Sequence, residues 1–210
     1  MNRRRFLTGS AAAASLLLVG RTLAEHEPTT RHTMNILILT GSPRTNGNSN
    51  YMAERFAAGA KEAGHNVMRF DCARHKINAC LACNACGMNG PCVQKDDFEL
   101  VRPHIIAADV IVLATPMYYF GFSAQLKTVI DRCYAINGII NGAPKKAILL
   151  MAYADNNKTK ENTLAMHYET LVRYMGWQDV GRVIAPGVWT AGAIAHTPYP
   201  ETAYRLGKSL

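Results

Sequence analysis

The most constraining feature of the sequence is a regular alternation of short apolar runs with longer amphipathic stretches. The first run, MNILILT at residues 34–40, is continuous and rich in branched residues, which is typical of a strand buried on both faces of a sheet. A helix is expected directly after it, at residues 49–64. Met52, Phe56 and Ala60 recur there at helical spacing. Strands of this kind, alternating with helices, predict a parallel sheet that is covered by helices on both faces.

The alternation continues toward the end of the chain. We expect further strands at residues 66–72, 109–115, 145–153 and 179–188, and further helices at residues 96–108, 124–136 and near 160–175. The helix at 96–108 is expected to begin at Asp96, with Glu99 completing a capping box. The predicted fold is therefore α/β, a doubly wound five-stranded parallel sheet in the order 2-1-3-4-5. Such sheets bind ligands in the crevice beyond the carboxyl ends of their strands.

Residues 1–24 have the three parts of an export signal. A basic head with three consecutive arginines precedes an apolar stretch at residues 11–19, and the small residue Ala24 ends the segment. Arginines followed directly by Phe and Leu, with a mild alanine-rich apolar run, are typical of twin-arginine signals. About ten apolar residues are too few to cross a hydrocarbon core, which needs roughly twenty. We therefore expect a periplasmic or otherwise exported protein that does not span the membrane.

A polar tether at residues 25–33 follows the signal, and residues 34–210 then form one domain. If translation instead starts at Met34, the protein is cytoplasmic. The net charge of +8 falls by half when the four arginines of the leader are set aside, and no basic stripe interleaved with aromatic residues occurs. This pattern argues against nucleic-acid binding and suits an anionic cofactor.

A polar loop follows the first strand and opens directly into a helix. The loop TGSPRTNGNSN at residues 40–50 combines backbone N–H groups at a helix start with the side chains of Ser42, Arg44, Asn48 and Ser49. Such groups surround a phosphate dianion well. The loop is neither a G-x-G-x-x-G dinucleotide fingerprint nor a Walker loop. A polar turn with a serine cap is the alternative, but the position after the first strand favours phosphate.

An aromatic segment follows the third strand, before the next helix. It consists of Pro116, Met117, Tyr118, Tyr119, Phe120 and Gly121. A flat ring can lie against such a wall while exposed amides reach its polar edge, although aromatic packing between loop and helix is an equal alternative. Both loops follow strands of one parallel sheet and so project from the same edge. We therefore expect the phosphate site and the ring site to face a single ligand.

The stretch CLACNACGMNGPC at residues 80–92 is a cysteine-rich insert. Cys80, Cys83, Cys86 and Cys92 have the spacing C-x2-C-x2-C-x5-C, which is close to the compact ferredoxin run that binds iron-sulfur clusters. Zinc would also satisfy four thiolates, and an oxidising compartment would favour disulfides. The other two cysteines, Cys72 and Cys133, fit strand and helix patterns and are expected in the core.

Four segments together resemble a known family. GSPRTNGNS, CLACNACGMNGPCVQKDDF, TPMYYFGFSAQLKTVIDR and AYRLGKSL are similar to the flavodoxin-like NAD(P)H-dependent FMN reductases, most closely to their iron-sulfur flavoprotein branch. The resemblance covers nearly all of residues 34–210 and implies a flavodoxin-like, FMN-binding domain. The leader departs from it, because most relatives start where Met34 stands.

The resemblance implies roles for specific residues. Ser42, Arg44, Asn48 and Ser49 would hold the FMN phosphate, and residues 116–121 would hold the isoalloxazine ring. A loop at residues 152–155 is a weaker cofactor candidate, and the four clustered cysteines would hold a [4Fe–4S] cluster. No protein side chain is assigned as a catalytic residue, since the chemistry takes place on FMN.

These observations predict an FMN-dependent oxidoreductase. It would transfer electrons from NAD(P)H, a quinol or a redox protein to a quinone-like or protein acceptor, with the cluster as a relay if one is present. An exported enzyme meets little NAD(P)H, so a quinol or periplasmic redox protein is the expected donor in that case. A homo-oligomer is expected. The alternatives are a non-enzymatic electron carrier like flavodoxin and an exported protein whose cysteines form structural disulfides.

Overall fold

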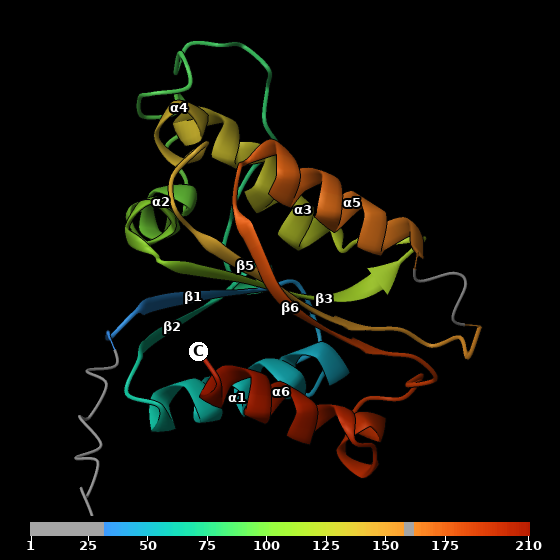
Figure 1. Cartoon of the computed structure of the whole chain (residues 1–210). Helices are drawn as coiled ribbons and strands as arrows, with labels where there is room; N and C mark the ends of the chain where they lie inside the picture. Colours follow the sequence, from blue (N-terminus) through green and yellow to red (C-terminus); the bar gives the residue numbers. More distant parts are fainter. Residues whose placement is uncertain (1–31, 158–161) are drawn as a thin grey trace, which may run out of the picture. The chain divides into compact units, whose positions relative to one another are not determined.

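A computed structural model describes residues 32–157 and 162–210, and shows a central sheet between two layers of helices (Figure 1). The predictions for residues 1–24 and for most of the tether lie outside the described residues. The strands are β1 (Asn35–Thr40), β2 (Asn66–Asp71), β3 (Val110–Tyr118), β4 (Gly121–Phe122), β5 (Lys146–Ala152) and β6 (Gln178–Ala185). The helices are α1 (Asn48–Glu62), α2 (Phe98–Ala107), α3 (Ala124–Arg132), α4 (Asn137–Ile140), α5 (Asn162–Tyr174) and α6 (Tyr199–Lys208).

The sheet order is β2-β1-β3-β5-β6, and all four pairings along this path are parallel. Counted without β4, this is the predicted order 2-1-3-4-5, so the predicted doubly wound fold is confirmed. The extra strand β4 pairs antiparallel with the end of β3. It extends β3 three residues beyond the predicted end of that strand at residue 115, because the chain turns straight back on itself as a hairpin.

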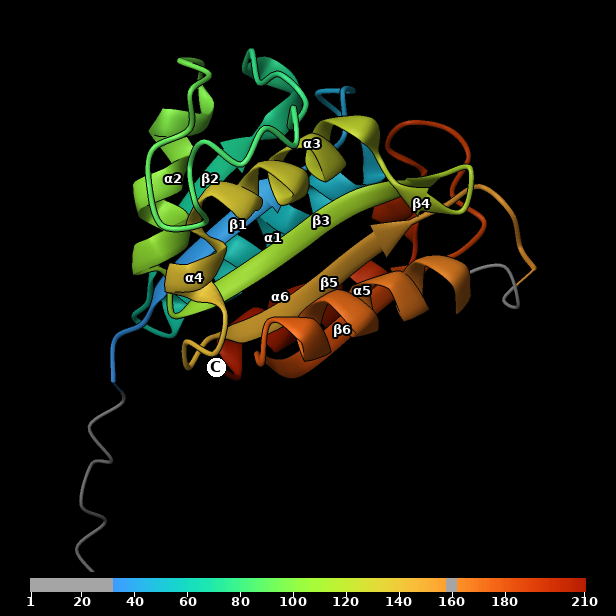
Figure 2. The same cartoon turned by 90° about the horizontal axis from the view of Figure 1, so that it is seen from above.

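Helices α1 and α6 cover one face of the sheet, and α2 to α5 cover the other (Figures 1 and 2). The continuous apolar strands pack against the helices on both faces of the sheet. In β1, Ile36 and Ile38 belong to the core under α1 and α6, whereas Leu37 and Leu39 belong to the core on the opposite face. Alternate side chains of a strand point to opposite faces, so a strand between two helical layers needs apolar residues at every position.

The last helix, α6, was not in the predicted series of elements, although its sequence contributes to the family resemblance. It packs closely on α1 through two glycines. A Cβ atom on Gly59 would lie 2.0 Å from the carbonyl oxygen of Tyr204, and one on Gly207 would lie 2.2 Å from that of Phe56. The backbones can approach this closely only because neither glycine has a side chain.

One predicted helix start is wrong in detail. Helix α2 begins at Phe98, and Asp96 lies before it in an irregular segment. The Asp96 carboxylate accepts the Phe98 N–H over 3.1 Å, but Glu99 pairs with Arg102 at 2.9 Å instead of closing a capping box. The other oxygen of Asp96 binds a buried arginine from α3, and this tertiary contact is not visible in the local sequence.

Candidate functional site

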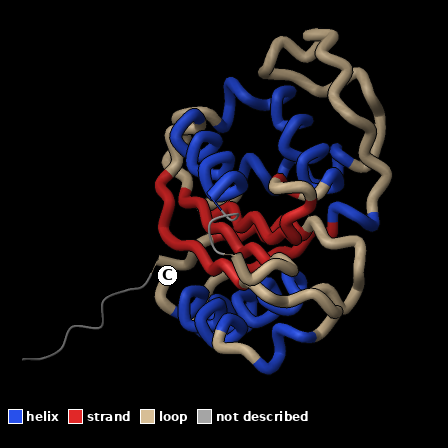
Figure 3. Tube along the Cα trace, turned by 90° about the vertical axis from the view of Figure 1, so that its right-hand side faces the viewer, coloured by secondary structure: helices blue, strands red, loops and turns tan. Residues whose placement is uncertain are grey.

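A cavity of about 660 Å³ opens where the parallel strands end, at the edge seen face-on in Figure 3. Its walls come from the ends of β3 and β5 and from the segments that follow β1, β3, β5 and β6. It is lined by Ser42, Arg44, Gly47, Asn48, Ser49, Pro116, Met117, Tyr118, Tyr119, Ala152, Tyr153, Ala154, Val188 and Trp189. The volume lies within the range of small-molecule and cofactor sites. The structure therefore brings the predicted phosphate loop and most of the predicted ring segment into one cavity.

The polar end of the cavity is the N-terminus of α1. This end of the helix has no side-chain cap and no acidic residue in its first turn, so its positive dipole is not compensated by the protein. Ser49 is 1% exposed, and its hydroxyl oxygen has no hydrogen-bond partner within the described residues. A buried hydroxyl without a partner is costly unless a ligand supplies one. A Cβ atom on Gly47 would lie 2.3 Å from the Ser42 hydroxyl, so only glycine allows the loop to bring Ser42 this close to the start of α1.

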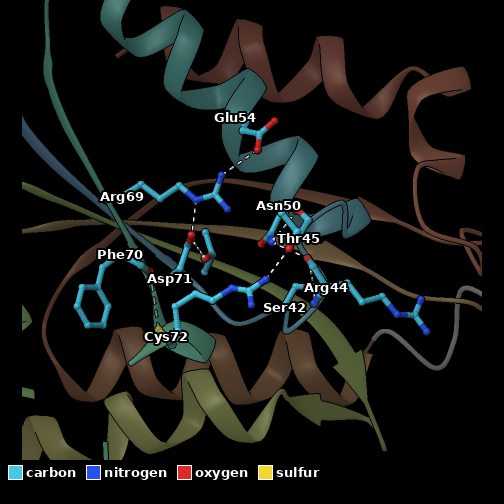
Figure 4. Close-up of polar contacts among 11 residues, drawn as sticks. Ser42, Arg44, Thr45, Asn50, Glu54, Arg69, Phe70, Asp71 and Cys72 are labelled. Carbon is cyan, nitrogen blue, oxygen red and sulfur yellow. Dashed lines mark hydrogen bonds and ion pairs between the residues drawn. The ribbon is translucent and has the colours of Figure 1, made fainter. Parts of the chain in front are cut away.

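Hydrogen bonds within the loop hold this shape (Figure 4). The Arg44 N–H donates to the Ser42 hydroxyl over 3.2 Å, and the Asn50 amide donates to the Arg44 carbonyl over 2.9 Å. The Arg44 guanidinium points away from these contacts in Figure 4 and makes no hydrogen bond or ion pair to another described residue. Its positive charge is therefore available to an anion in the cavity.

Asp71, at the end of the neighbouring strand β2, supports the same loop. Its carboxylate accepts the Thr40 hydroxyl over 2.5 Å and the Arg69 guanidinium over 2.6 Å (Figure 4). Burial by itself would raise the pKa of Asp71, but these two hydrogen bonds and the charges of Arg69 and Arg74 together hold the pKa below its ordinary value. Asp71 therefore remains ionised and fixes the last residue of β1, directly before the loop.

Asn48 lines the cavity, and its side chain makes hydrogen bonds to the loop after β6. Its amide donates to the carbonyls of Val188 and Thr190 at 3.0 and 2.9 Å, and its carbonyl oxygen accepts the Ile194 N–H at 3.3 Å. The side chain is therefore occupied in tying the loop after β6 to the start of α1. Of the four predicted phosphate ligands, Ser42, Arg44 and Ser49 have side chains suited to that role.

The predicted ring segment is a β-hairpin. Met117 pairs with Phe122 and Tyr118 with Gly121, so Tyr119 and Phe120 form a two-residue turn with φ values of 44° and 65°. Positive φ at both positions is the mark of a type I′ turn, which normally has Asn and Gly there. Pro116, Met117, Tyr118 and Tyr119 lie on the cavity wall, whereas Phe120 and Gly121 are not among the residues that line it. Binding of the ring by residues 116–121 stays a prediction.

Ser123 joins the hairpin to the phosphate loop. It is fully buried, caps α3 by accepting the Leu126 N–H, and donates its hydroxyl to the Gly41 carbonyl over 2.8 Å. Its own N–H donates to the Thr115 hydroxyl over 3.1 Å. The two loops are thus held in a fixed relation before any ligand binds, which lowers the entropic cost of binding.

Two further walls of the cavity come from later loops. Ala152, Tyr153 and Ala154 line it, as the weaker prediction for residues 152–155 suggested, but Asp155 does not. Trp189, after β6, was not predicted; it lines the cavity with its side chain 75% exposed. The signal in the sequence was the presence of a tryptophan directly after the predicted strand at residues 179–188.

The cysteine insert lies elsewhere, over the helical layer near α4, whereas β4 lies at the opposite end of that layer (Figures 1 and 2). Cys80, Cys83, Cys86 and Cys92 all line one small cavity of about 20 Å³, in an irregular loop with positive φ at Ala82, Asn84, Gly87 and Met88. None of these cysteines lines the larger cavity. Helix α3 separates the two sites, and its nine residues span roughly 13 Å at 1.5 Å per residue.

All six cysteines of the chain are free thiols in this structure. In residues 32–157 and 162–210, no group of three or more His, Cys, Asp or Glu side chains is placed to hold a single metal ion. Each thiolate of a [4Fe–4S] cluster binds a separate iron, so its sulfurs stand farther apart than those around a single ion. The insert supplies four free thiols from one loop, which is the donor type and number that such a cluster needs. Two glycines in this loop allow its backbone to change conformation around a cluster.

Cys72 and Cys133 are buried, as predicted. Burial raises the pKa of both thiols to about 12, so both stay protonated at neutral pH. A protonated, buried thiol is a poor nucleophile and a poor metal ligand. The redox and metal chemistry of cysteine in this chain is therefore confined to the insert.

The comparisons with known proteins agree with this geometry. The family model for NADPH-dependent FMN reductase matches residues 34–190. An iron-sulfur flavoprotein of Archaeoglobus fulgidus is 31% identical over 157 residues, covering 74% of this chain and 70% of that protein. An iron-sulfur flavoprotein of Methanocaldococcus jannaschii is 40% identical over 105 residues, covering 49% of this chain and 52% of the relative. The matched region thus spans about half the length of that second relative.

A solved structure shows the same fold at low sequence identity. The NAD(P)H:quinone oxidoreductase from Methanothermobacter marburgensis superposes with a TM-score of 0.67 at 20% identity, over 85% of this chain and 96% of that one. Fold, cavity and family model together define a flavodoxin-like, flavin-dependent oxidoreductase. Within that class, the chain belongs to the NADPH-dependent FMN reductase family. None of the helices in the described part of the chain is long and apolar enough to cross a membrane.

Proposed function

We propose that the protein binds FMN in the larger cavity and transfers electrons from a reduced donor to a quinone-like acceptor. The observation that carries this proposal is the cavity itself, which joins an uncompensated helix N-terminus to an aromatic hairpin. When bound, FMN supplies hydride acceptance and one-electron transfer. The matching family, NADPH-dependent FMN reductase, is named for both redox partners, FMN and NADPH.

The residues of the chain would bind and orient the cofactor. Ser42, Ser49 and Arg44 would hold the phosphate, with the α1 N-terminus adding its dipole. Tyr118, Tyr119 and Trp189, which line the cavity, would shield the ring from water and form a slot for a flat acceptor. No side chain of this site is needed as a nucleophile, so the contribution of the protein is position and electrostatics.

The experiment that tests this function separates an enzyme from an electron carrier. FMN-loaded protein is reduced without oxygen, and its reoxidation by a soluble benzoquinone is followed at 450 nm over a range of quinone concentrations. An enzyme with an acceptor slot gives a rate that saturates with quinone. A rate that stays proportional to quinone concentration, with no difference in a Trp189→Ala variant, would support the electron-carrier alternative.

We propose further that the cysteine insert holds a [4Fe–4S] cluster that relays electrons. The spacing of the four cysteines, their free thiols around one cavity and the names of the two iron-sulfur flavoproteins support this assignment. Protein prepared without oxygen and reconstituted should contain about four irons and four sulfides per chain. Absence of iron, together with thiols that resist alkylation until reduced, would favour the disulfide alternative.

Export by the twin-arginine route is a proposal from the leader sequence, which lies outside the described residues. If it is correct, we expect a quinol or a periplasmic redox protein to be the donor, and slow oxidation of NADPH in vitro. Residues 1–33 fused to a reporter that is active only after folded export should give signal, and changing Arg3 and Arg4 to lysine should abolish it. A silent fusion, or fast turnover of NADPH at about 10 per second, would favour the cytoplasmic alternative.

A further inference from the structure

Arg132, the last residue of α3, is buried beneath the cysteine insert with its side chain only 1% exposed. It lines the same small cavity as Cys80, Cys83, Cys86 and Cys92. Arginine is rarely buried without a specific partner, because removing its charge from water is costly. Negative groups near Arg132 are therefore needed to compensate its buried charge.

The guanidinium is held in place by several groups at the base of the insert. One terminal nitrogen donates to the Asn78 carbonyl at 2.9 Å and to Asp96 at 2.6 Å, and the carbon of the guanidinium lies 4.9 Å from the centre of the Phe98 ring. The Nε atom, in contrast, has no hydrogen-bond partner within the described residues. The Nε–H group of this buried cation therefore has no acceptor among the described residues.

Cys92 lines the same small cavity as this cation. An arginine guanidinium is not deprotonated in folded proteins. The side chain is therefore charged at any pH at which the protein is folded. Lys95 also lies near Cys92, donating to its carbonyl over 3.2 Å, but Lys95 is exposed and its charge is screened by water.

Asp96 balances Arg132 within the pair, so the pair alone has no net charge. Four thiolates around iron and sulfide carry a net negative charge, and each electron accepted adds one more. A buried cation beside such a site stabilises the more negative, reduced form, whereas a buried carboxylate destabilises it. The positions of the two side chains therefore predict opposite effects on electron affinity.

We propose that Arg132 is a charge-compensating residue of the four-cysteine site, which raises the reduction potential of the cluster and is opposed in this by Asp96. The inference rests on the cluster proposed above. In the step concerned, the oxidised cluster gains one electron from reduced flavin, no bond forms or breaks and no proton is taken up. The Arg132 charge and its unused Nε–H compensate the added negative charge.

The test is an anaerobic redox titration of the cluster, followed by its electron paramagnetic resonance signal, in the full-length protein. Arg132→Gln removes the cation and should shift the one-electron equilibrium on the order of tenfold toward the oxidised form, which lowers the midpoint by about 59 mV. Asp96→Asn should shift the midpoint upward by a similar amount. Arg132→Lys keeps the charge and should stay close to the wild-type value.

Arg182→Gln is the matched control. Arg182 also pairs with an aspartate at 2.6 Å and lies 5.1 Å from the centre of a tyrosine ring, but it is on β6, far along the chain from the insert. Its replacement should leave the midpoint unchanged. Iron, sulfide and FMN content are measured for every variant, so that a loss of fold is separated from a change of potential.

The possible results separate the two proposals. Opposite shifts for Arg132→Gln and Asp96→Asn support the inference, because a merely structural pair would not change the potential with opposite signs. Equal midpoints in iron-loaded wild type and both variants overturn it while leaving the cluster in place. If Arg132→Gln fails to hold iron, an unchanged midpoint in Asp96→Asn overturns it. Wild-type protein without iron overturns the cluster and this inference together, but leaves the FMN proposal intact.

Discussion

The hydroxyl of Ser49 is the residue-scale observation most specific to a phosphate ligand, because it is buried and without a partner in the described chain. We predict that Ser49→Ala weakens FMN binding about fivefold, the loss of one hydrogen bond of about 1 kcal/mol. The same variant should leave the FMN-free protein equally stable or more stable, because an unsatisfied buried group is removed. Flavin fluorescence titration and thermal unfolding without FMN measure the two effects. Destabilisation of the FMN-free protein would mean that the hydroxyl has a structural partner.

Replacing Arg44, in the same loop, should weaken FMN binding more than replacing Ser49. Its guanidinium has no partner among the described residues, so Arg44→Ala should cost binding but not folding. A charge-assisted hydrogen bond is worth roughly 1.5–3 kcal/mol, and FMN affinity should therefore fall by about ten- to a hundredfold. Lys61→Ala, in the last turn of α1, is a control that removes a positive charge far from the cavity. Equal loss of affinity in both variants would point to net charge alone.

Local sequence was sufficient for some of these residues and not for others. The loop after the first strand could be predicted because hydroxyls, an arginine and a helix start lie within ten positions of each other. The hydrogen bonds of the Asn48 side chain could not be predicted, because their partners are 140 and more residues away in the sequence. The contact of Arg132 with Asp96 likewise joins residues 36 positions apart. Pattern and spacing report only on neighbours in the chain.

At the scale of elements, the hairpin of β3 and β4 is the main feature that the sequence did not reveal. Its turn is Tyr119 and Phe120, which have none of the Asn-Gly character typical of type I′ turns. Non-glycine residues at positive φ cost about 1–3 kcal/mol each. Phe120 does not line the cavity, so Phe120→Gly should raise stability by about 1 kcal/mol and leave FMN affinity unchanged. Denaturant unfolding and flavin titration test this, and a loss of FMN affinity would place Phe120 at the ring.

The cysteine insert gives a second prediction at this scale. In metal-free, reduced protein, four cysteines should react quickly with an alkylating reagent at neutral pH, whereas Cys72 and Cys133 should react only after unfolding. The reason is that burial raises the pKa of those two thiols to about 12. Mass spectrometry of peptides after timed alkylation identifies the labelled positions. Fast labelling of Cys133 in the folded protein would show that the helical layer beneath the insert opens.

At the scale of the whole molecule, a parallel sheet covered on both faces could be predicted because continuous apolar runs indicate burial on both faces. The stability of this sheet should depend on pH through Asp71, which links β1 and β2. Its pKa is lowered in the folded protein, so its contribution is present above the ordinary aspartate value of about 4 and is lost as the pH falls through the folded value. Asp71→Asn should flatten the acid limb of a plot of unfolding free energy against pH. An unchanged acid limb would mean that other carboxylates dominate it.

The most direct test of the account compares FMN with riboflavin, which has the same ring and lacks the phosphate. Titration of the flavin-free protein with each, followed by quenching of flavin fluorescence, gives the two dissociation constants. We predict that FMN binds with one molecule per chain and that riboflavin binds at least about tenfold more weakly, because riboflavin offers no phosphate to the α1 N-terminus, Ser49 and Arg44. Equal affinity for the two flavins, or binding of neither, would contradict it.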